Sequence, residues 1–205
     1  MISLTLAAAP LHAADPGVDA LLARLARPAP DSTSFVEIRY SSLLKRPIVV
    51  SGRLEHREDG TLVRRVETPY AEVTELRGEN VVVKREGSKP RRFALDRAPE
   101  LRGMLASFGA ILKGDRPMLD RYFVVTAQGD RARWEITLTP RDEKIKRRLS
   151  AIVVDGAEDR AKCFTLEEPD GDASLMALGV AGPDELPAAF ERQTLHDWCT
   201  NGSRQ

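Results

Sequence analysis

The chain has 205 residues, enough for one domain with a sizeable core but short for two. Lys and Arg together number 31, Asp and Glu together also number 31, and the formal net charge is zero. This balance excludes a global electrostatic field that would attract nucleic acid or an anionic membrane, and we expect no nucleic-acid partner.

The first fourteen residues are apolar and small, and Leu11-His12-Ala13 followed by Ala14-Asp15 resembles a signal-peptidase site. We therefore expect residues 1–14 to be a signal peptide, although an ordinary N-terminal helix or strand is the alternative. No Lys or Arg precedes the apolar stretch, which indicates that the peptide is incomplete. Export would place residues 15–205, read as a single domain, in the periplasm.

A short helix is expected from Val18 to Leu25, where leucines recur at helical spacing before Pro28. After this helix, apolar residues recur at every second position, as in Val36, Ile38 and Tyr40. A second alternating segment follows, with Ile48, Val50 and Leu54 on one face. Both segments are typical of half-buried antiparallel strands.

Four more short strands are expected near residues 62–67, 70–77, 80–86 and 91–95, separated by turn signals such as Asp59-Gly60 and Gly87-Ser88. Six strands in a row form a meander, which twists and curves. One face of such a sheet is apolar, so another element must cover it.

Helical periodicity returns from Pro99 to Lys113, with a broad apolar stripe that includes Leu101, Leu105 and Phe108. A second short helix is expected from Pro117 to Tyr122. These helices are the expected cover of the concave apolar face, and a purely structural role as core is the ordinary alternative.

Strands are expected again from Phe123, around Trp134, Ile136 and Leu138, and near 149–155, 161–168 and 173–179. A short polar helical stretch from Asp142 to Arg148 interrupts them. Beyond Gly182 an amphipathic segment ends at Trp198-Cys199. The fold class expected is therefore α+β, mostly β, with an unclosed antiparallel barrel and a helical lid.

Cys163 and Cys199 are the two cysteines, and an even pair in an oxidising compartment predicts a disulfide. It would stabilise the fold by about 4 kcal/mol in the loop-entropy model. Two separate buried thiols are the alternative. Neither cysteine has zinc-ligand spacing with a histidine, so we expect no metal and no cofactor.

The order of these elements resembles that of the LolA-like outer-membrane lipoprotein carriers, from about Val18 to Val180. The segments that carry the resemblance are Gly52-Arg53-Leu54, Pro69, Gly78-Glu79, Lys113-Gly114-Asp115, Arg133-Trp134-Glu135-Ile136-Thr137-Leu138-Thr139-Pro140 and Glu167-Glu168-Pro169-Asp170-Gly171-Asp172. In that family a Lys-Arg-Pro run ends the second strand and a tryptophan lies on the third. Here Arg57-Glu58-Asp59-Gly60 and Arg64 occupy about those places.

The resemblance implies a monomeric, non-catalytic carrier that binds the hydrophobic part of a lipoprotein, glycolipid or other lipid-like client. It also implies an inner-membrane exporter as donor and an outer-membrane acceptor. We expect the cavity to be lined by Val36, Ile38, Tyr40, Val50, Leu54, Leu101, Leu105, Phe108, Trp134, Ile136 and Leu138. Arg64, on the same strand face as Leu62 and Val66, would pair with a head group or a lid helix, unless that face is a wet edge.

Two other function classes are weaker on sequence grounds. An enzyme would need a catalytic motif, and His196-Asp197 beside Cys199 is the one thiol arrangement that suggests itself. The alternative to a carrier is a periplasmic binding or sensor module with a closed core, in which basic segments such as Lys144 to Arg148 contact a protein partner.

Overall fold

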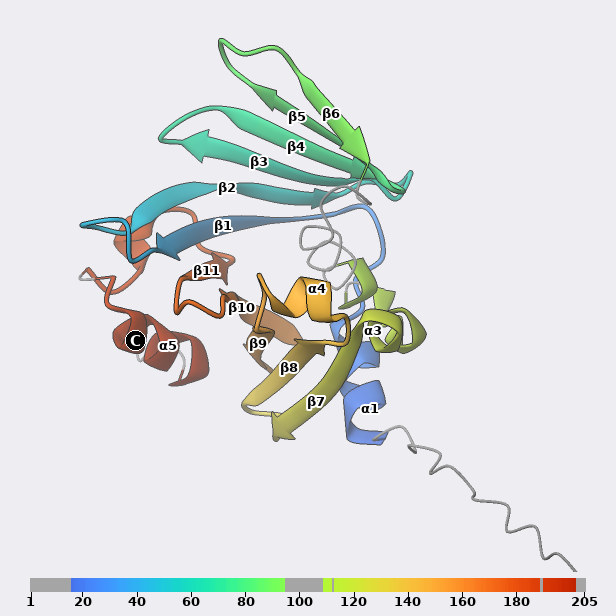
Figure 1. Ribbon diagram of the computed structural model, residues 1–205. Coiled ribbons are helices and arrows are strands. Elements are labelled where there is room, and N and C mark those ends of the chain that lie inside the picture. The colour runs from blue at the N-terminus through green and yellow to red at the C-terminus, as the bar shows by residue number, and fades with distance from the viewer. Residues whose placement is uncertain (1–15, 95–108, 112, 189, 202–205) are drawn as a thin grey trace, which may run out of the picture.

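The computed structural model describes residues 16–94, 109–111, 113–188 and 190–201. Eleven strands form one antiparallel sheet in the order β6-β5-β4-β3-β2-β1-β11-β10-β9-β8-β7 (Figure 1). The strands are β1 (Asp31–Tyr40), β2 (Ile48–His56), β3 (Leu62–Thr68), β4 (Glu72–Arg77), β5 (Asn80–Arg85), β6 (Arg91–Ala94), β7 (Phe123–Gly129), β8 (Trp134–Pro140), β9 (Ala151–Ala157), β10 (Arg160–Glu167) and β11 (Ala173–Leu178). The eleven predicted strands and the unclosed, mostly β architecture are thereby confirmed.

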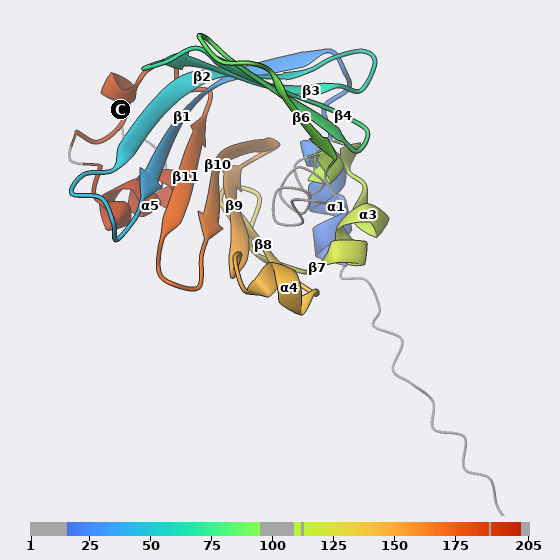
Figure 2. The same ribbon diagram turned by 45° about the horizontal axis from the view of Figure 1, so that its top comes forward.

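The sheet consists of two meanders, β1–β6 and β7–β11, which meet where β1 pairs with β11. It curves strongly, and Figure 2 shows β6 and β7 as its two separate ends. Curvature of this kind follows from the right-handed twist of successive antiparallel strands. The result is a concave face and a convex face with different partners.

The helices divide between these faces. α1 (Pro16–Leu25) and α3 (Arg116–Tyr122) lie at the β7 end of the concave side, whereas α5 (Arg192–Asn201) lies on the convex side (Figure 2). α4 (Glu143–Lys146) and the 3₁₀ helix η2 (Pro183–Glu185) are short connecting pieces. Residues 1–14 and the predicted lid residues Leu101, Leu105 and Phe108 lie outside the described residues.

The sequence explains why α3 begins where it does. The Asp115 side chain accepts a hydrogen bond from the Met118 N–H at 3.0 Å, and Pro117 occupies the first turn, where its missing N–H is harmless. Gly114 precedes the cap with φ +64°, and a Cβ there would lie 3.2 Å from the Leu22 carbonyl oxygen of α1. A glycine at this turn thus lets α1 and the α3 region approach closely.

A disulfide between Cys163 of β10 and Cys199 of α5 attaches the C-terminal helix to the convex face, with the two Cα atoms 5.8 Å apart. The predicted bridge is confirmed. Leu195 of α5 is fully buried beside it, among Val36, Ile38 and Leu175. The convex face of the central strands is therefore covered by protein.

Gly52 permits a register shift in the β2–β3 ladder, where Ser51 pairs with Thr68 but Gly52 pairs with Val66. A Cβ at Gly52 would lie 1.9 Å from the Arg65 carbonyl oxygen, which is backbone and cannot rotate away. Glycine here allows the two strands to come together at the irregularity.

Gly52→Ala is expected to lower the free energy of unfolding by about 2 kcal/mol, since the added methyl group overlaps backbone. Chemical denaturation of the two proteins measures this. Gly109→Ala is the matched control, because a Cβ there would make only an ordinary 3.5 Å contact with the flexible Leu62 side chain. Equal effects of the two substitutions would contradict the steric account.

Candidate ligand-binding face

The concave face over β7–β10 is apolar. Trp134, Ile136 and Leu138 of β8 point into it, and each is 5% exposed or less. Cross-strand pairing places Val154 beside Ile136 and Ile152 beside Leu138 on the same face. Four residues of α1 pack over this surface and are nearly or fully buried: Val18, Leu21, Leu22 and Leu25.

Trp134 lies across β9 because Gly156 is its cross-strand partner. A Cβ at Gly156 would lie 2.1 Å from the Cζ2 atom of the Trp134 ring, so no other residue leaves room for the indole. The indole N–H donates a hydrogen bond to the Glu158 carbonyl oxygen at 3.2 Å. The ring is thus held in one orientation at the end of the apolar surface.

The apolar face continues over β1–β3, where Phe35, Val50 and Val66 form a buried cluster. Partly buried Leu54, Met176 and Leu178 contact it. Further along the sheet, Leu76 and Val81 pack with Leu62, Val83 and Phe93. Apolar side chains therefore extend along the concave face from β8 to β6.

A buried carboxylate interrupts this surface. Glu37 of β1 is 4% exposed and forms an ion pair with Arg64 of β3. It also accepts hydrogen bonds from Arg39 at 2.5 Å and from the Ser174 hydroxyl at 2.8 Å. Arg64 lies over the Phe35 ring, 5.1 Å from its centre, and within 4.0 Å of Glu72. We call Glu37, Arg39, Arg64 and Ser174 the polar cluster.

The polar cluster explains how a charge is tolerated on the concave face. Burial by itself raises the pKa of Glu37, but the positive charges of Arg64 and Arg39, with the hydrogen bonds from Arg39 and Ser174, lower it below its usual value. The pKa of Arg39 is raised: burial alone would lower it, and the Glu37 carboxylate outweighs that effect. Glu37 therefore stays ionised at neutral pH.

The predicted lining residues divide into three groups. Six share the concave face: Val50, Leu54, Arg64, Trp134, Ile136 and Leu138. Three of β1 lie on the opposite, convex face near α5, and these are Val36, Ile38 and Tyr40. The concave side of β1 instead presents Phe35, Glu37 and Arg39. The remaining three, Leu101, Leu105 and Phe108, lie outside the described residues.

The two faces of β1 are the reverse of those expected. Val36 and Ile38, expected on the concave side, pack against α5 on the convex side. From the alternation alone, Val36, Ile38 and Tyr40 were expected to face inward, because the alternate positions include the charged residues Glu37 and Arg39. The signal that points to the observed phase is Arg64, which needs a carboxylate partner on its own face. Arg57, by contrast, lies at the β2–β3 turn, where it pairs with Glu55 at 3.4 Å and Glu75 at 3.8 Å.

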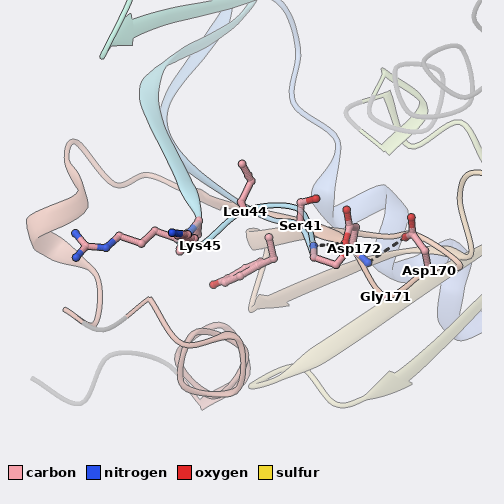
Figure 3. A pocket seen from close by; sticks show the side chains of 10 residues that line it. Ser41, Leu44, Lys45, Asp170, Gly171 and Asp172 are labelled. Carbon is pink, nitrogen blue, oxygen red and sulfur yellow. Dashed lines mark hydrogen bonds between the residues drawn. The ribbon is translucent and has the colours of Figure 1, made fainter.

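Two pockets lie away from the concave face. One, of about 410 Å³, lies on the convex side between Tyr40, strands β10 and β11, and the Arg192, Gln193 and His196 side chains of α5. The other, of about 280 Å³, lies between the β1–β2 turn and the Asp170-Gly171-Asp172 turn (Figure 3). The Tyr40 hydroxyl, which donates to the Phe190 carbonyl oxygen at 2.9 Å, has a pKa raised to about 12 by burial.

Sequence reasoning missed Asp155, which is 2% exposed on the convex side of β9. Its Oδ2 atom has no hydrogen-bond partner, and its pKa is raised to about 6 by burial and by the nearby negative charge of Glu135, with His196 acting in the opposite direction.

Within the described ranges no group of three His, Cys, Asp or Glu side chains could hold a metal ion. Nor does this part of the chain contain a helix long and apolar enough to cross a membrane.

Comparison with known proteins gives one family. A sequence model described as outer membrane lipoprotein carrier protein LolA-like matches residues 8–201. No curated protein matches the chain in sequence.

Three solved structures illustrate the likeness in fold. The LolA superfamily protein NE2245 from Nitrosomonas europaea is 10% identical with a TM-score of 0.46, and the match covers 86% of this chain and 97% of that chain. LprF from Mycobacterium bovis is 13% identical with a TM-score of 0.37, covering 82% and 94%. The MucA/MucB complex of Pseudomonas aeruginosa is 17% identical with a TM-score of 0.35, and the match covers 84% of this chain and 61% of that chain. None reaches a TM-score of 0.5, so the family assignment depends on the family model.

Glu37→Gln is expected to lower the free energy of unfolding at pH 7 by about 3 kcal/mol, because it leaves Arg64 and Arg39 without their buried counter-charge. Since the pKa of Glu37 is lowered by folding, its contribution is present above the unfolded value near 4.5 and is lost as the pH falls through the folded value. The difference between the two proteins should therefore shrink in acid.

Denaturation at a series of pH values measures this difference. Glu67→Gln is the control, because Glu67 is half exposed and 3.9 Å from Arg53. It should change stability by less than about 0.5 kcal/mol. A difference for Glu37→Gln that grows in acid would contradict the assigned role.

Asp155→Asn tests the second buried carboxyl. Its folded pKa, about 6, lies above the unfolded value, so its favourable contribution is complete below about pH 4 and is lost as the pH rises through 6. Between pH 4 and pH 8 the stability of the variant relative to the original protein should rise by about 2 kcal/mol. Asp197→Asn, on the exposed side of α5, is the control. A stability difference between Asp155→Asn and the original protein that does not change with pH would refute the assignment.

Proposed function

Because the chain belongs to the LolA-like outer-membrane lipoprotein carrier family, we propose that it is a periplasmic carrier of a hydrophobic client. Proteins of this family bind hydrophobic ligands. The client is the acyl or other hydrophobic part of a lipoprotein, glycolipid or lipid-like molecule, which the protein carries from the inner towards the outer membrane. An inner-membrane exporter supplies it and an outer-membrane component accepts it.

The observation that carries the proposal is the concave face itself. Apolar side chains of both meanders lie on it, and the polar cluster, with Glu37 buried at its centre, lies among them. An acyl chain could replace contacts between the sheet and its cover, while polar groups of the client would lie near Arg39 and Arg64. Such a surface is chemically suited to a molecule with an apolar chain and a polar end.

The physics of release limits how the client is held. Burial of a long acyl chain contributes about 0.8 kcal/mol per methylene, so complete enclosure would bind too tightly for ready transfer. Competition between the client and the residues that pack on the concave face lowers the net affinity. α1 is one such element, since Val18 and Leu22 are fully buried against that face.

A second function has one observation in its favour. Ile136 and Leu138 are fully buried, and the two pockets described above lie away from the concave face. A module with a closed core that recognises a protein partner would have the same features. Ligand binding distinguishes this module from a carrier.

The test is titration of the purified protein with a fluorescent fatty-acid probe, followed by displacement with long-chain lipids. Saturable and displaceable binding is expected. Leu54→Glu, on the concave side of β2, should weaken binding by about tenfold or more, since it introduces a charge where the chain would lie. Val49→Glu is the matched control, because Val49 is also half-buried in β2 but lies on the convex side.

Absence of probe binding by a folded protein would contradict the carrier and favour the closed-core module. Equal loss in Leu54→Glu and Val49→Glu would contradict binding on the concave face. Circular dichroism of both variants establishes that each is folded.

A further inference from the structure

The turn between β1 and β2 exposes an unusual group of apolar side chains. Four large apolar residues in the described chain are exposed, and three of them lie within six consecutive positions, in the turn and at the first residue of β2. Leu43 is 91% exposed, Leu44 42% and Ile48 43%, whereas Val124, at 44%, lies on another strand. We call residues 41–47 the leucine tip.

Hydrogen bonds hold the leucine tip in a defined conformation. The Leu44 N–H donates to the Ser41 carbonyl oxygen at 3.0 Å, and the Ser42 N–H donates to the Asp172 carboxylate at 2.8 Å. Asp172 is itself fixed, because its N–H donates to the Asp170 side chain at 3.1 Å. The exposure of Leu43 and Leu44 is thus imposed by an anchored turn that cannot readily fold them inward.

Two cations follow the leucines directly. Lys45 and Arg46 are exposed and make no ion pair with a described carboxylate. In Figure 3 Lys45 lies at the left end of the pocket, and Asp172 and Asp170 lie at its right end. The net charge of the whole chain is zero, so any attraction to an anionic surface must come from local groups such as these.

We propose that the leucine tip docks the protein on an anionic phospholipid bilayer. Leu43 and Leu44 enter the interface between head groups and acyl chains, and Lys45 and Arg46 contact lipid phosphates. Exposed leucines beside lysine and arginine have the chemistry of interfacial membrane anchors. This docking is independent of the ligand proposed for the concave face.

The size of the tip favours a bilayer over a protein partner. A stable protein interface buries about 800 Å² on each side and involves about 20–30 residues. The leucine tip offers a few protruding side chains at the end of a hairpin. A bilayer accepts single side chains, whereas a protein would need a larger complementary surface.

The binding is expected to be reversible. One turn with two leucines and two cations gives weak attachment compared with a membrane-spanning helix. The salt dependence should reveal the contribution of Lys45 and Arg46, since screening weakens contacts between exposed charges.

Flotation of the full chain with vesicles tests the proposal, using phosphatidylethanolamine vesicles with and without phosphatidylglycerol. Binding is expected to the anionic vesicles and to decrease with salt. Leu43→Ser and Leu44→Ser should each weaken it by about tenfold. Lys45→Gln and Arg46→Gln should each weaken it by about fivefold on anionic vesicles.

Val124→Ser is the matched control for Leu44→Ser, because Val124 is as exposed as Leu44 and lies on a strand far from the tip in sequence. It should leave flotation unchanged. Failure of the unaltered protein to float with anionic vesicles would overturn the proposal, as would equal binding by Leu43→Ser. Binding of the fatty-acid probe, measured in parallel, should be the same in Leu43→Ser, so failure of docking and failure of the carrier function are distinguishable.

Discussion

Strand β1 joins the two halves of the sheet, because it pairs with β2 on one edge and with β11 on the other. Its central residues are buried on both faces. Val36 and Ile38 lie among residues packed with α5, while Phe35 and Glu37 face the concave side. The curved surface therefore depends on a strand that is enclosed from both directions, and a change in its register would reverse both faces at once.

The polar cluster is a consequence of that enclosure. Glu37 lies at the centre of β1, and its charge is tolerated because Arg64 and Arg39 reach it from β3 and β1 and Ser174 from β11. A buried ion pair is weak evidence of net stabilisation, since desolvation offsets much of the attraction. Its specific effect is to favour one register between β1, β2 and β3, because a slipped strand would bury an unpaired charge.

Much of the fold could be predicted from the sequence. An alternating segment such as the one with Trp134, Ile136 and Leu138 predicts both a strand and the face that is buried, because its apolar residues all lie on one face of the strand. Turn residues such as Gly60 and Gly171 adopt positive φ, and they mark the ends of strands correctly. The cysteine pair, together with the expectation of export, predicted a disulfide, which is present.

The concave phase of β1 could not be predicted in the same way. A strand buried on both faces has no hydrophobic periodicity that distinguishes one face from the other. The charged residues Glu37 and Arg39 made the face that is in fact concave look like the solvent-exposed face. Recognising it requires the partner Arg64, 27 positions away, and hence the pairing of three strands. Asp155 was missed for a related reason, because its burial depends on the convex-side packing of α5 near β9.

The central claim is that the concave face binds a hydrophobic client, and photo-crosslinking tests it most directly. A fatty acid with a diazirine group near its terminal methyl would be bound, irradiated and located by peptide mass spectrometry. The account predicts labelled residues on the concave side, near Leu54, Leu178 and Trp134. Labelling concentrated around Tyr40, Arg192 and His196 would instead place the ligand in the convex-side pocket and contradict the account.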